Sequence, residues 1–484
     1  MNVPGPGSKW TKLIYQTPLL TPAQWIRMLF SKIISEGLAH NSYIVGLGGK
    51  AAVVDPRRDC DIYLELAGAH DMKIAFIFET HRNEDYAIGS CELADLTDSE
   101  ILHGSRLDFK YGTPVMDGDK FVIGGLEIEV IETPGHTDES ISLVLRDKTV
   151  SDNPYMVFTG DALFAGDVGR TDLLGVGRRC QTSEALYDSI FEKILPLGDG
   201  VIVCPAHGAG SVCGMDISDH ELTTIGYEKE TNSLLKMDRA AFSDFKTREH
   251  HYIPPYFRKM EELNHSGSPL IHRVPSLTPF RNHEVNLLKK EQAQLLDIRA
   301  PTSYGAGHIP GSICIWREGL ASFIGWFLNY EDPIILVDDF NLEMDPVIRQ
   351  FVRMGYDNLA GYLAGGFPAW FKGAEEIRQI ESLSVQQLHE RLRTSSPYLL
   401  DVRDINNWNE VGHIPGAHQC YIGELSGHMS DIPVDKDAPV IVYCDAGYKG
   451  CLGASILKNA GYSNVANLLG GMTAWVNAGY PVEK

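Results

Sequence analysis

Hydrophobic residues in the first half of the chain occur in short runs, and four of these runs lead into a histidine or an aspartate. Short apolar runs bounded by glycine or proline are typical of buried strands. The carboxyl ends of such strands are where α/β folds place their sites. The four endings are Thr80-His81 after residues 74–78, Thr133-Pro134-Gly135-His136 after residues 126–131, Gly160-Asp161 after residues 156–159, and Pro205-Ala206-His207-Gly208 after residues 201–204. Together they predict one metal centre.

Two glycine pairs in the same region predict hairpins, because paired glycines between apolar runs favour the tight turns of antiparallel strands. A helix is expected over about residues 60–70, and the acidic residues after His81 indicate the start of another helix. The expected hairpins are residues 42–46 with 51–55 around Gly48-Gly49, and residues 121–123 with 126–131 around Gly124-Gly125.

Proline- and glycine-containing segments at residues 254–258 and 266–269 mark the close of this domain and a linker, and beyond the linker the chain repeats itself with an offset of 104 or 105 residues. Each copy alternates apolar strands, such as residues 333–337 and 439–443, with helical segments. This pattern predicts a small parallel α/β domain that occurs twice. The matching motifs are Leu295-Leu296-Asp297-Ile298-Arg299 with Leu399-Leu400-Asp401-Val402-Arg403, Gly307-His308-Ile309-Pro310-Gly311 with Gly412-His413-Ile414-Pro415-Gly416, and Gly365-Gly366-Phe367-Pro368-Ala369-Trp370 with Gly470-Gly471-Met472-Thr473-Ala474-Trp475.

Composition narrows the classes of partner. The 484 residues suggest about three domains. The net charge of -22 argues against nucleic acid or an anionic membrane as a partner, and the chain has no apolar run of 18 residues. Nine cysteines without a CxxC pair indicate free thiols in a reducing compartment. We therefore expect a cytoplasmic protein, without a membrane partner, that forms a homo-oligomer.

His81, His136 and Asp161 are the candidate metal ligands. Two imidazoles and one carboxylate can occupy one face of an octahedron and leave the other positions open, which suits one Fe(II) per chain that binds both oxygen and a substrate. Asp85 and His207 are interpreted as groups that orient ligands or water around the metal. Either residue becomes a direct ligand if the metal differs.

These motifs resemble the metallo-β-lactamase superfamily, which implies an αββα sandwich over roughly residues 29–264. The usual metal-binding stretch of that superfamily is His-x-His-x-Asp-His, and here Asn83 and Tyr86 stand at the second and last histidine positions. Their loss leaves too few ligands for two zinc ions. The remaining triad resembles the iron site of the persulfide dioxygenase (sulfur dioxygenase) branch, as do residues 167–172 and 255–257.

That branch implies oxidation of a low-molecular-weight persulfide, of the glutathione or coenzyme A type, by oxygen to sulfite and the thiol. Zinc is the expected substitute for Fe(II). Arg170 is a candidate for binding the anionic groups of the thiol carrier, with a salt bridge as the equally weighted alternative. Cys213 either holds sulfur transiently or is an inert loop cysteine.

The second repeat carries a candidate nucleophile, Cys444, in a loop between a strand and an expected helix. Successive N–H groups in such a loop form an anion-binding nest, and the helix N-terminus adds positive potential. Both effects predict a lowered pKa for the Cys444 thiol. With Asp401-Val402-Arg403 and His413-Ile414-Pro415-Gly416, the loop resembles a rhodanese sulfurtransferase. The resemblance implies that sulfite or thiosulfate is bound by Asp445, Ala446, Gly447, Tyr448 and Lys449.

The first repeat departs from this pattern, because Asp338 stands at the cysteine position. A carboxylate does not accept a sulfane sulfur, and its charge repels anionic donors. We therefore expect the first copy to be an inactive spacer or docking unit. Cys314 lies on another expected strand and is not a replacement.

The predicted organisation is an extension (1–28), a metallo-β-lactamase-like domain (29–265), an inactive rhodanese-like domain (277–375) and an active rhodanese domain (381–484). The predicted function is persulfide oxidation coupled to sulfur transfer through Cys444, for sulfide detoxification. The main alternative is a zinc-dependent thioester hydrolase of the glyoxalase II kind. A non-enzymatic sulfur-binding sensor is a further hypothesis.

Overall fold

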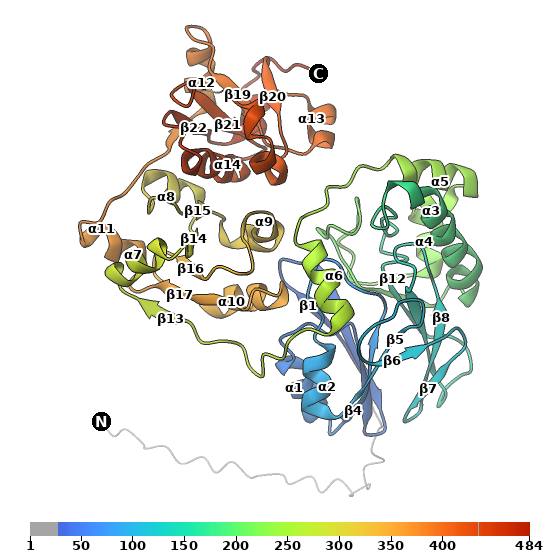
Figure 1. The fold of residues 1–484 in the computed structure, drawn as a ribbon. Helices are drawn as coiled ribbons and strands as arrows, with labels where there is room; N and C mark the ends of the chain where they lie inside the picture. The colour runs from blue at the N-terminus through green and yellow to red at the C-terminus, as the bar shows by residue number, and fades with distance from the viewer. Residues whose placement is uncertain (1–27, 434) are drawn as a thin grey trace, which may run out of the picture.

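A computed structural model describes residues 28–433 and 435–484. The expected extension lies outside the described residues except for Met28. Figure 1 shows a large first domain joined to two smaller domains that follow it along the chain. Among the described residues, no helix combines the length and apolar character needed to cross a membrane.

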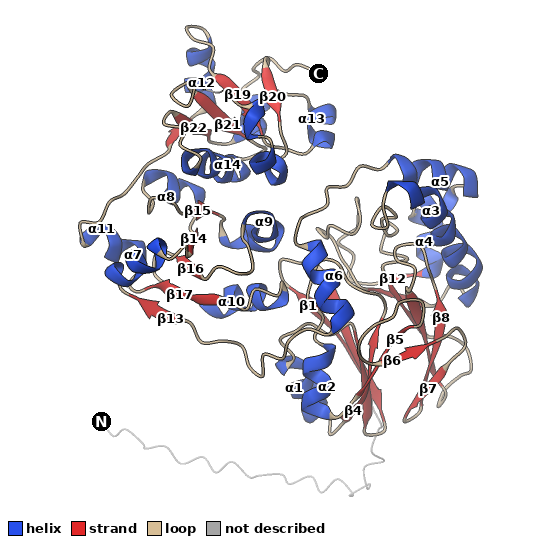
Figure 2. Ribbon diagram, viewed as in Figure 1, coloured by secondary structure: helices blue, strands red, loops and turns tan. Residues whose placement is uncertain are grey.

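The first domain consists of two six-stranded sheets that pack face to face, with helices on both outer faces (Figure 2). The first sheet contains, in order, β1 (Leu29–Ser35), β2 (His40–Leu47), β3 (Lys50–Val54), β4 (Lys73–Glu79), β5 (Glu100–Gly104) and β6 (Thr113–Val115). The second has the order β12-β11-β10-β9-β8-β7, with β7 (Lys120–Ile123), β8 (Leu126–Glu132), β9 (Ile141–Asp147), β10 (Met156–Gly160), β11 (Ile202–Pro205) and β12 (Thr223–Thr224).

Three apolar clusters correspond to the contacts between these layers. One lies between the two sheets and includes Phe78 and Phe158. A second joins the first sheet to its helices through Tyr63 and Leu93. A third joins the second sheet to its helices. The helices are α1 (Asp61–Ala69), α2 (Ser90–Thr97), α3 (Arg179–Asp188), α4 (Ile225–Thr231), α5 (Arg239–Arg248) and α6 (Phe257–Ser266). The predicted αββα sandwich is confirmed.

Both predicted hairpins are present, and their turns touch. The backbone of Gly48 has a φ of +62° and that of Gly124 a φ of +60°, a region that glycine adopts without strain. A Cβ atom on Gly124 would lie 2.0 Å from the Leu47 carbonyl oxygen. Glycine at this position therefore permits the two sheets to approach each other at their turns.

The prediction of a helix directly after His81 is wrong. Residues 81–89 form an irregular loop, and α2 begins only at Ser90. The Asn264 side chain donates hydrogen bonds to the carbonyl oxygens of Asn83 and Tyr86, each at 2.7 Å, and accepts one from the N–H of Ile88. These bonds to a distant residue replace the local ones that a helix would form.

The two repeats have the same fold, which confirms the duplication. Each is a five-stranded parallel sheet, with the order β13-β17-β16-β14-β15 in the first and β18-β22-β21-β19-β20 in the second. The first contains β13 (Thr278–Phe280), α7 (Asn282–Lys290), β14 (Gln294–Asp297), α8 (Pro301–Ala306), β15 (Ile313–Cys314), α9 (Leu320–Phe327), β16 (Ile334–Val337), α10 (Met344–Arg353), β17 (Leu359–Leu363) and α11 (Gly366–Lys372). The second contains β18 (Glu381–Leu383), α12 (Val385–Leu392), β19 (Tyr398–Asp401), α13 (Ile405–Val411), β20 (Ala417–Gln419), β21 (Val440–Tyr443), α14 (Tyr448–Asn459), β22 (Val465–Leu468) and α15 (Gly471–Asn477).

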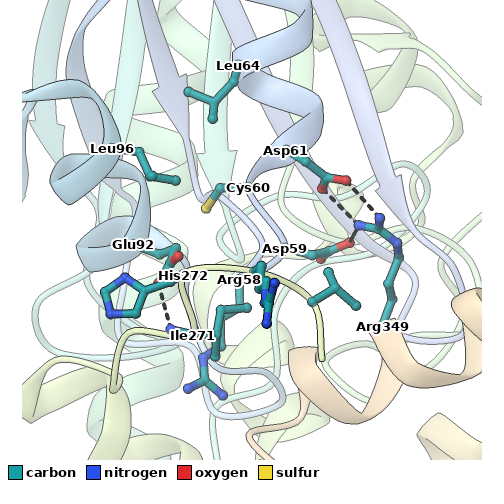
Figure 3. A pocket seen from close by; sticks show the side chains of 12 residues that line it. Arg58, Asp59, Cys60, Asp61, Leu64, Glu92, Leu96, Ile271, His272 and Arg349 are labelled. Atoms are coloured by element: carbon teal, nitrogen blue, oxygen red, sulfur yellow. Dashed lines mark hydrogen bonds and ion pairs between the residues drawn. The ribbon is translucent and has the colours of Figure 1, made fainter. Parts of the chain in front are cut away.

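A buried ion pair joins the first repeat to the sandwich. Arg353, at the end of α10, donates from Nε and Nη2 to the two carboxylate oxygens of Asp59, each at 2.8 Å. Arg349 also reaches Asp59, together with Asp61, beside a cavity of about 290 Å³ (Figure 3). The Arg353 carbonyl oxygen accepts a hydrogen bond from the N–H of Ala87, at 2.7 Å. The first repeat therefore supports the loop that follows His81.

Replacing Asp59 with alanine is expected to lower the melting temperature by roughly 6 °C or more. A buried ion pair that loses one partner costs about 3–5 kcal/mol, and each kcal/mol shifts the melting temperature of a domain this size by about 2–4 °C. Differential scanning calorimetry of the full chain measures the shift.

The matched control is Glu381→Ala, because Glu381 pairs with Arg391 at the surface. An exposed pair contributes about 1 kcal/mol or less. Equal shifts in the two variants would contradict a role of the Asp59 pair in joining the domains.

Candidate metal centre and nucleophilic cysteine

His81, His136 and Asp161 come together at one edge of the sandwich, as their sequence positions predict. His81 follows β4 of the first sheet, whereas His136 and Asp161 follow β8 and β10 of the second. Asp161 Oδ2 lies 3.9 Å from His81 Nε2 and 3.5 Å from His136 Nε2. All three side chains are buried.

Hydrogen bonds orient both histidines so that Nε2 faces the centre. The Thr80 hydroxyl donates to Asp55 Oδ2 at 2.8 Å, so it accepts from Nδ1–H of His81 at 3.0 Å. Nδ1–H of His136 donates to the Arg170 carbonyl oxygen, at 3.0 Å. Burial lowers the pKa of His81 to about 4, so its imidazole is neutral at neutral pH. His81 Nε2 therefore presents a lone pair to the centre.

Glu84 is a fourth residue of this cluster, and the sequence analysis missed it. Its Oε2 lies 3.3 Å from His136 Nε2 and 4.0 Å from His81 Nε2. Burial opposes ionisation of Glu84, but the charge and hydrogen bond of His136 outweigh it and lower the pKa of Glu84 to about 2. The only signal in the sequence is its place three residues after His81, which we assigned to a helix start.

His207 lies between two carboxylates. Its Nδ1 is 2.8 Å from Asp161 Oδ1, and its Nε2 is 3.0 Å from Asp85 Oδ2. Burial alone would lower the pKa of His207, but Asp161 and Asp85 outweigh that effect and raise it well above its usual value. A protonated imidazole that bridges two carboxylates balances part of their negative charge.

The two positions that depart from the superfamily motif have structural roles. Asn83 donates from Nδ2 to the carbonyl oxygen of His81, at 3.2 Å. The Tyr86 ring is fully buried, packs 3.9 Å from the His40 ring between centroids, and belongs to an apolar cluster that extends into both repeats.

The donor set fits a first-row divalent metal. His81 Nε2 is buried and has no hydrogen-bond partner, which is costly unless a ligand satisfies it. Atoms of His81, Glu84 and His136 lie within 4.8 Å of one another. Imidazole nitrogen and carboxylate oxygen bind iron, zinc and manganese, so the donors imply a metal without selecting one.

Arg170 and Cys213 are both buried close to this cluster. Arg170 donates from Nε and Nη2 to Asp172, at 2.7 and 2.8 Å, and its Nη1 contacts backbone carbonyls. This geometry favours the salt bridge over anion binding. Cys213 Sγ donates to Glu84 Oε1, at 3.3 Å, and burial raises the pKa of the Cys213 thiol. Cys213 is therefore held against the cluster.

Cys444 follows β21 directly, and its Sγ accepts a hydrogen bond from the N–H of Gly447, at 3.2 Å. The helix α14 begins at Tyr448, so Tyr448 and Lys449 lie in its first turn. The prediction of a lowered pKa for the Cys444 thiol is wrong. Burial raises the pKa of the Cys444 thiol, and this effect exceeds the opposing effects of nearby N–H groups and the Lys449 charge. Lys449 itself pairs with Asp445, at 3.0 Å.

Asp338 follows β16 as Cys444 follows β21. Its Oδ2 accepts hydrogen bonds from the N–H groups of Phe340 and Asn341, at 3.1 and 2.7 Å, and pairs with Arg317 at 3.2 Å. The carboxylate therefore occupies the N–H nest of its own loop.

Comparison with known proteins agrees with this architecture. Residues 36–207 match the Metallo-beta-lactamase superfamily, and residues 284–372 and 384–478 each match the Rhodanese-like domain. A crystal structure of a metallo-beta-lactamase from Staphylococcus aureus subsp. aureus COL is 30% identical, aligns with 70% of this chain and 99% of that chain, and has a TM-score of 0.63.

Two curated relatives of this chain are named for different activities. Persulfide dioxygenase ETHE1 from Bos taurus is 31% identical over 168 residues, which are 33% of this chain and 59% of that protein. Hydroxyacylglutathione hydrolase GloC from Haemophilus influenzae is 27% identical over 207 residues, 38% of this chain and 87% of that protein. The αββα sandwich, its buried His and carboxylate cluster and the two parallel repeats lead to one conclusion: the chain belongs to the metallo-beta-lactamase superfamily and carries two rhodanese-like domains.

Proposed function

We propose that this protein is an iron-dependent persulfide dioxygenase fused to a rhodanese sulfurtransferase. The observation that carries the proposal is the convergence of two oriented Nε2 atoms, from His81 and His136, with the Asp161 carboxylate. Such a set holds one Fe(II) and leaves positions for oxygen and substrate. The similarity to persulfide dioxygenases supports the choice of reaction.

The reaction converts a persulfide, oxygen and water into a thiol and sulfite: R–S–SH + O2 + H2O gives R–SH + H2SO3. The S–S bond breaks, the terminal sulfur is oxidised and oxygen is reduced. When bound, Fe(II) supplies the redox chemistry that brings oxygen and the persulfide sulfur together. The substrate class is a low-molecular-weight thiol persulfide, of the glutathione or coenzyme A type.

The residues around the triad maintain its geometry and charge. Asp55 and Thr80 orient His81, and the Arg170 carbonyl oxygen orients His136. His207 holds Asp161 through a hydrogen bond of 2.8 Å and balances its charge. Ligands held in this way do not need to reorganise when the metal binds.

The second repeat then transfers sulfur through Cys444. A sulfane sulfur on Cys444 is attacked by sulfite, the S–S bond to Cys444 breaks, and thiosulfate leaves while Cys444 regains its thiolate. The N–H group of Gly447 and the charge of Lys449 stabilise that thiolate. The reverse reaction supplies persulfide from thiosulfate. Fusion of the two domains raises the local concentration of the shared intermediate.

The first repeat is proposed to be inactive in sulfur transfer. Asp338 fills the N–H nest that would otherwise bind an anion, and Arg317 neutralises it. The role left to this repeat is mechanical, because Arg353 contacts both Asp59 and the loop after His81.

A glyoxalase II-like thioester hydrolase with zinc is the second candidate. The similarity to hydroxyacylglutathione hydrolase favours it. The hydrolase would need two zinc ions, whereas Asn83 and Tyr86 supply no imidazole for the second. Binding of two equivalents of zinc per chain, with thioester hydrolysis, would support this candidate over the dioxygenase.

Anaerobic loading with Fe(II) is expected to give about one iron per chain and oxygen uptake with glutathione or coenzyme A persulfide, with sulfite as product. The variant Asp161→Asn loses a charged ligand, so iron affinity is expected to fall by about tenfold or more and oxygen uptake to fall with it. An oxygen electrode and iron analysis measure the two effects.

Asp199→Asn is the control, because Asp199 is exposed in the same domain. An iron-replete wild-type protein without oxygen uptake would refute the proposal.

The variant Cys444→Ser is expected to lose sulfur transfer from thiosulfate to a thiol acceptor by roughly three orders of magnitude or more, as for other essential nucleophiles. Oxygen uptake should remain. Cys420→Ser is the control, since Cys420 is a partly buried cysteine of the same domain. Unchanged sulfur transfer in Cys444→Ser would refute the proposal that Cys444 carries the transferred sulfur.

A further inference from the structure

Glu84 stands where a metal ligand would stand, although it belongs to neither the predicted triad nor the usual superfamily motif. Its side chain is 1% exposed, and its Oε2 faces both imidazole nitrogens, at 3.3 and 4.0 Å. His81 Nε2, in the same cluster, is buried without a hydrogen-bond partner. A carboxylate and an unsatisfied imidazole directed at a common point indicate a shared ligand.

We propose that Glu84 is a fourth protein ligand of the metal, so that the site is formed by two histidines and two carboxylates. This inference rests on the proposed function only in taking the metal to be iron. It makes Glu84 a residue that selects the metal.

The distances agree with four ligands around one ion. Metal–ligand bonds of about 2.0–2.2 Å place neighbouring ligand atoms of an octahedron about 3.0 Å apart and opposite atoms about 4.2 Å apart. The four distances between an imidazole nitrogen and a carboxylate oxygen are 3.3, 3.5, 3.9 and 4.0 Å. Glu84 Oε2 therefore lies as close to the two imidazoles as Asp161 Oδ2 does.

Cys213 holds the other oxygen of Glu84. Its Sγ donates to Oε1 at 3.3 Å, while Oε2 faces the histidines and is hydrogen-bonded to His136 Nε2 at 3.3 Å. The backbone of Glu84 is held as well, because Asn264 binds the carbonyl oxygens of Asn83 and Tyr86 on either side of it. Glu84 is thus preorganised by residues that are not ligands themselves.

A fourth ligand has different consequences for the two candidate metals. Zinc with four protein ligands is coordinatively closed, as in structural zinc sites, and has no position for a reactive water. A six-coordinate metal keeps two positions, which suffice for oxygen and one substrate sulfur. Glu84 therefore favours chemistry on a six-coordinate ion and suppresses hydrolysis by zinc.

The test is metal binding by the full chain, with Mn(II) as a spectroscopic probe. Water-proton relaxation counts the waters on the bound ion, and chelator competition measures its affinity. The variant Glu84→Ala is expected to bind Mn(II) and Fe(II) about tenfold or more weakly. It should also gain about one bound water relative to the wild type. Glu84→Gln preserves the shape of the side chain and should lose affinity in the same direction, whereas Glu84→Asp should recover part of it.

Glu92→Gln is the matched control, because Glu92 is also a buried glutamate but accepts its hydrogen bond from Ile271, away from the cluster. It should leave affinity and water count unchanged. Melting curves identify any variant that fails to fold, and Glu84→Gln then replaces Glu84→Ala. Wild-type affinity and water count in a folded Glu84 variant would overturn the proposal, provided that Asp161→Asn loses metal in the same assay.

The result of this binding test is independent of the result of the oxygen-uptake test of the proposed function. Absent oxygen uptake in the iron-loaded wild type would refute the dioxygenase and leave the ligand count measurable with Mn(II). Conversely, unchanged binding in Glu84 variants would refute the fourth ligand and leave oxygen uptake intact.

Discussion

The cluster of His81, Glu84, His136 and Asp161 depends on hydrogen bonds that hold the loop after His81 out of a helix. Asn264 accepts from and donates to the backbone on both sides of Glu84, and the Arg353 carbonyl oxygen binds the N–H of Ala87. A buried loop is stable only if its polar backbone groups find partners. Here the partners come from α6 and from the first repeat. The loop conformation turns Glu84 toward the histidines, so the composition of the site follows from packing between domains.

A second constraint is charge inside the sandwich. Buried carboxylates require compensation, and the cluster contains Glu84, Asp85 and Asp161 together. His207 bridges two of them as a cation, and His136 faces the third. The contacts of His207 with Asp161 and Asp85 thus balance negative charge that burial would otherwise make costly.

The two repeats share an equivalent loop after a central strand, but its first residue differs between them. In both repeats a strand ends at a nest of N–H groups, but Cys444 presents a sulfur to its nest and Asp338 fills its own. The first repeat retains the fold and uses another surface, the end of α10, to contact the sandwich. In the proposed function, fusion links the metal-binding domain to the sulfur-transfer loop through a repeat whose contribution is structural.

The sequence by itself determined the duplication and the convergence of His81, His136 and Asp161, because apolar periodicity and strand endings are local signals. The αββα sandwich followed from the resemblance of the motifs to a known superfamily. The tertiary structure alone decided the loop after His81, since its partner Asn264 lies 181 residues from Asn83. It also decided that Arg170 is bound by Asp172 and that burial raises the pKa of Cys444. Burial and long-range hydrogen bonds depend on which distant segments pack together, so the spacing of Glu84 from His81 did not by itself identify Glu84 as part of the candidate metal site.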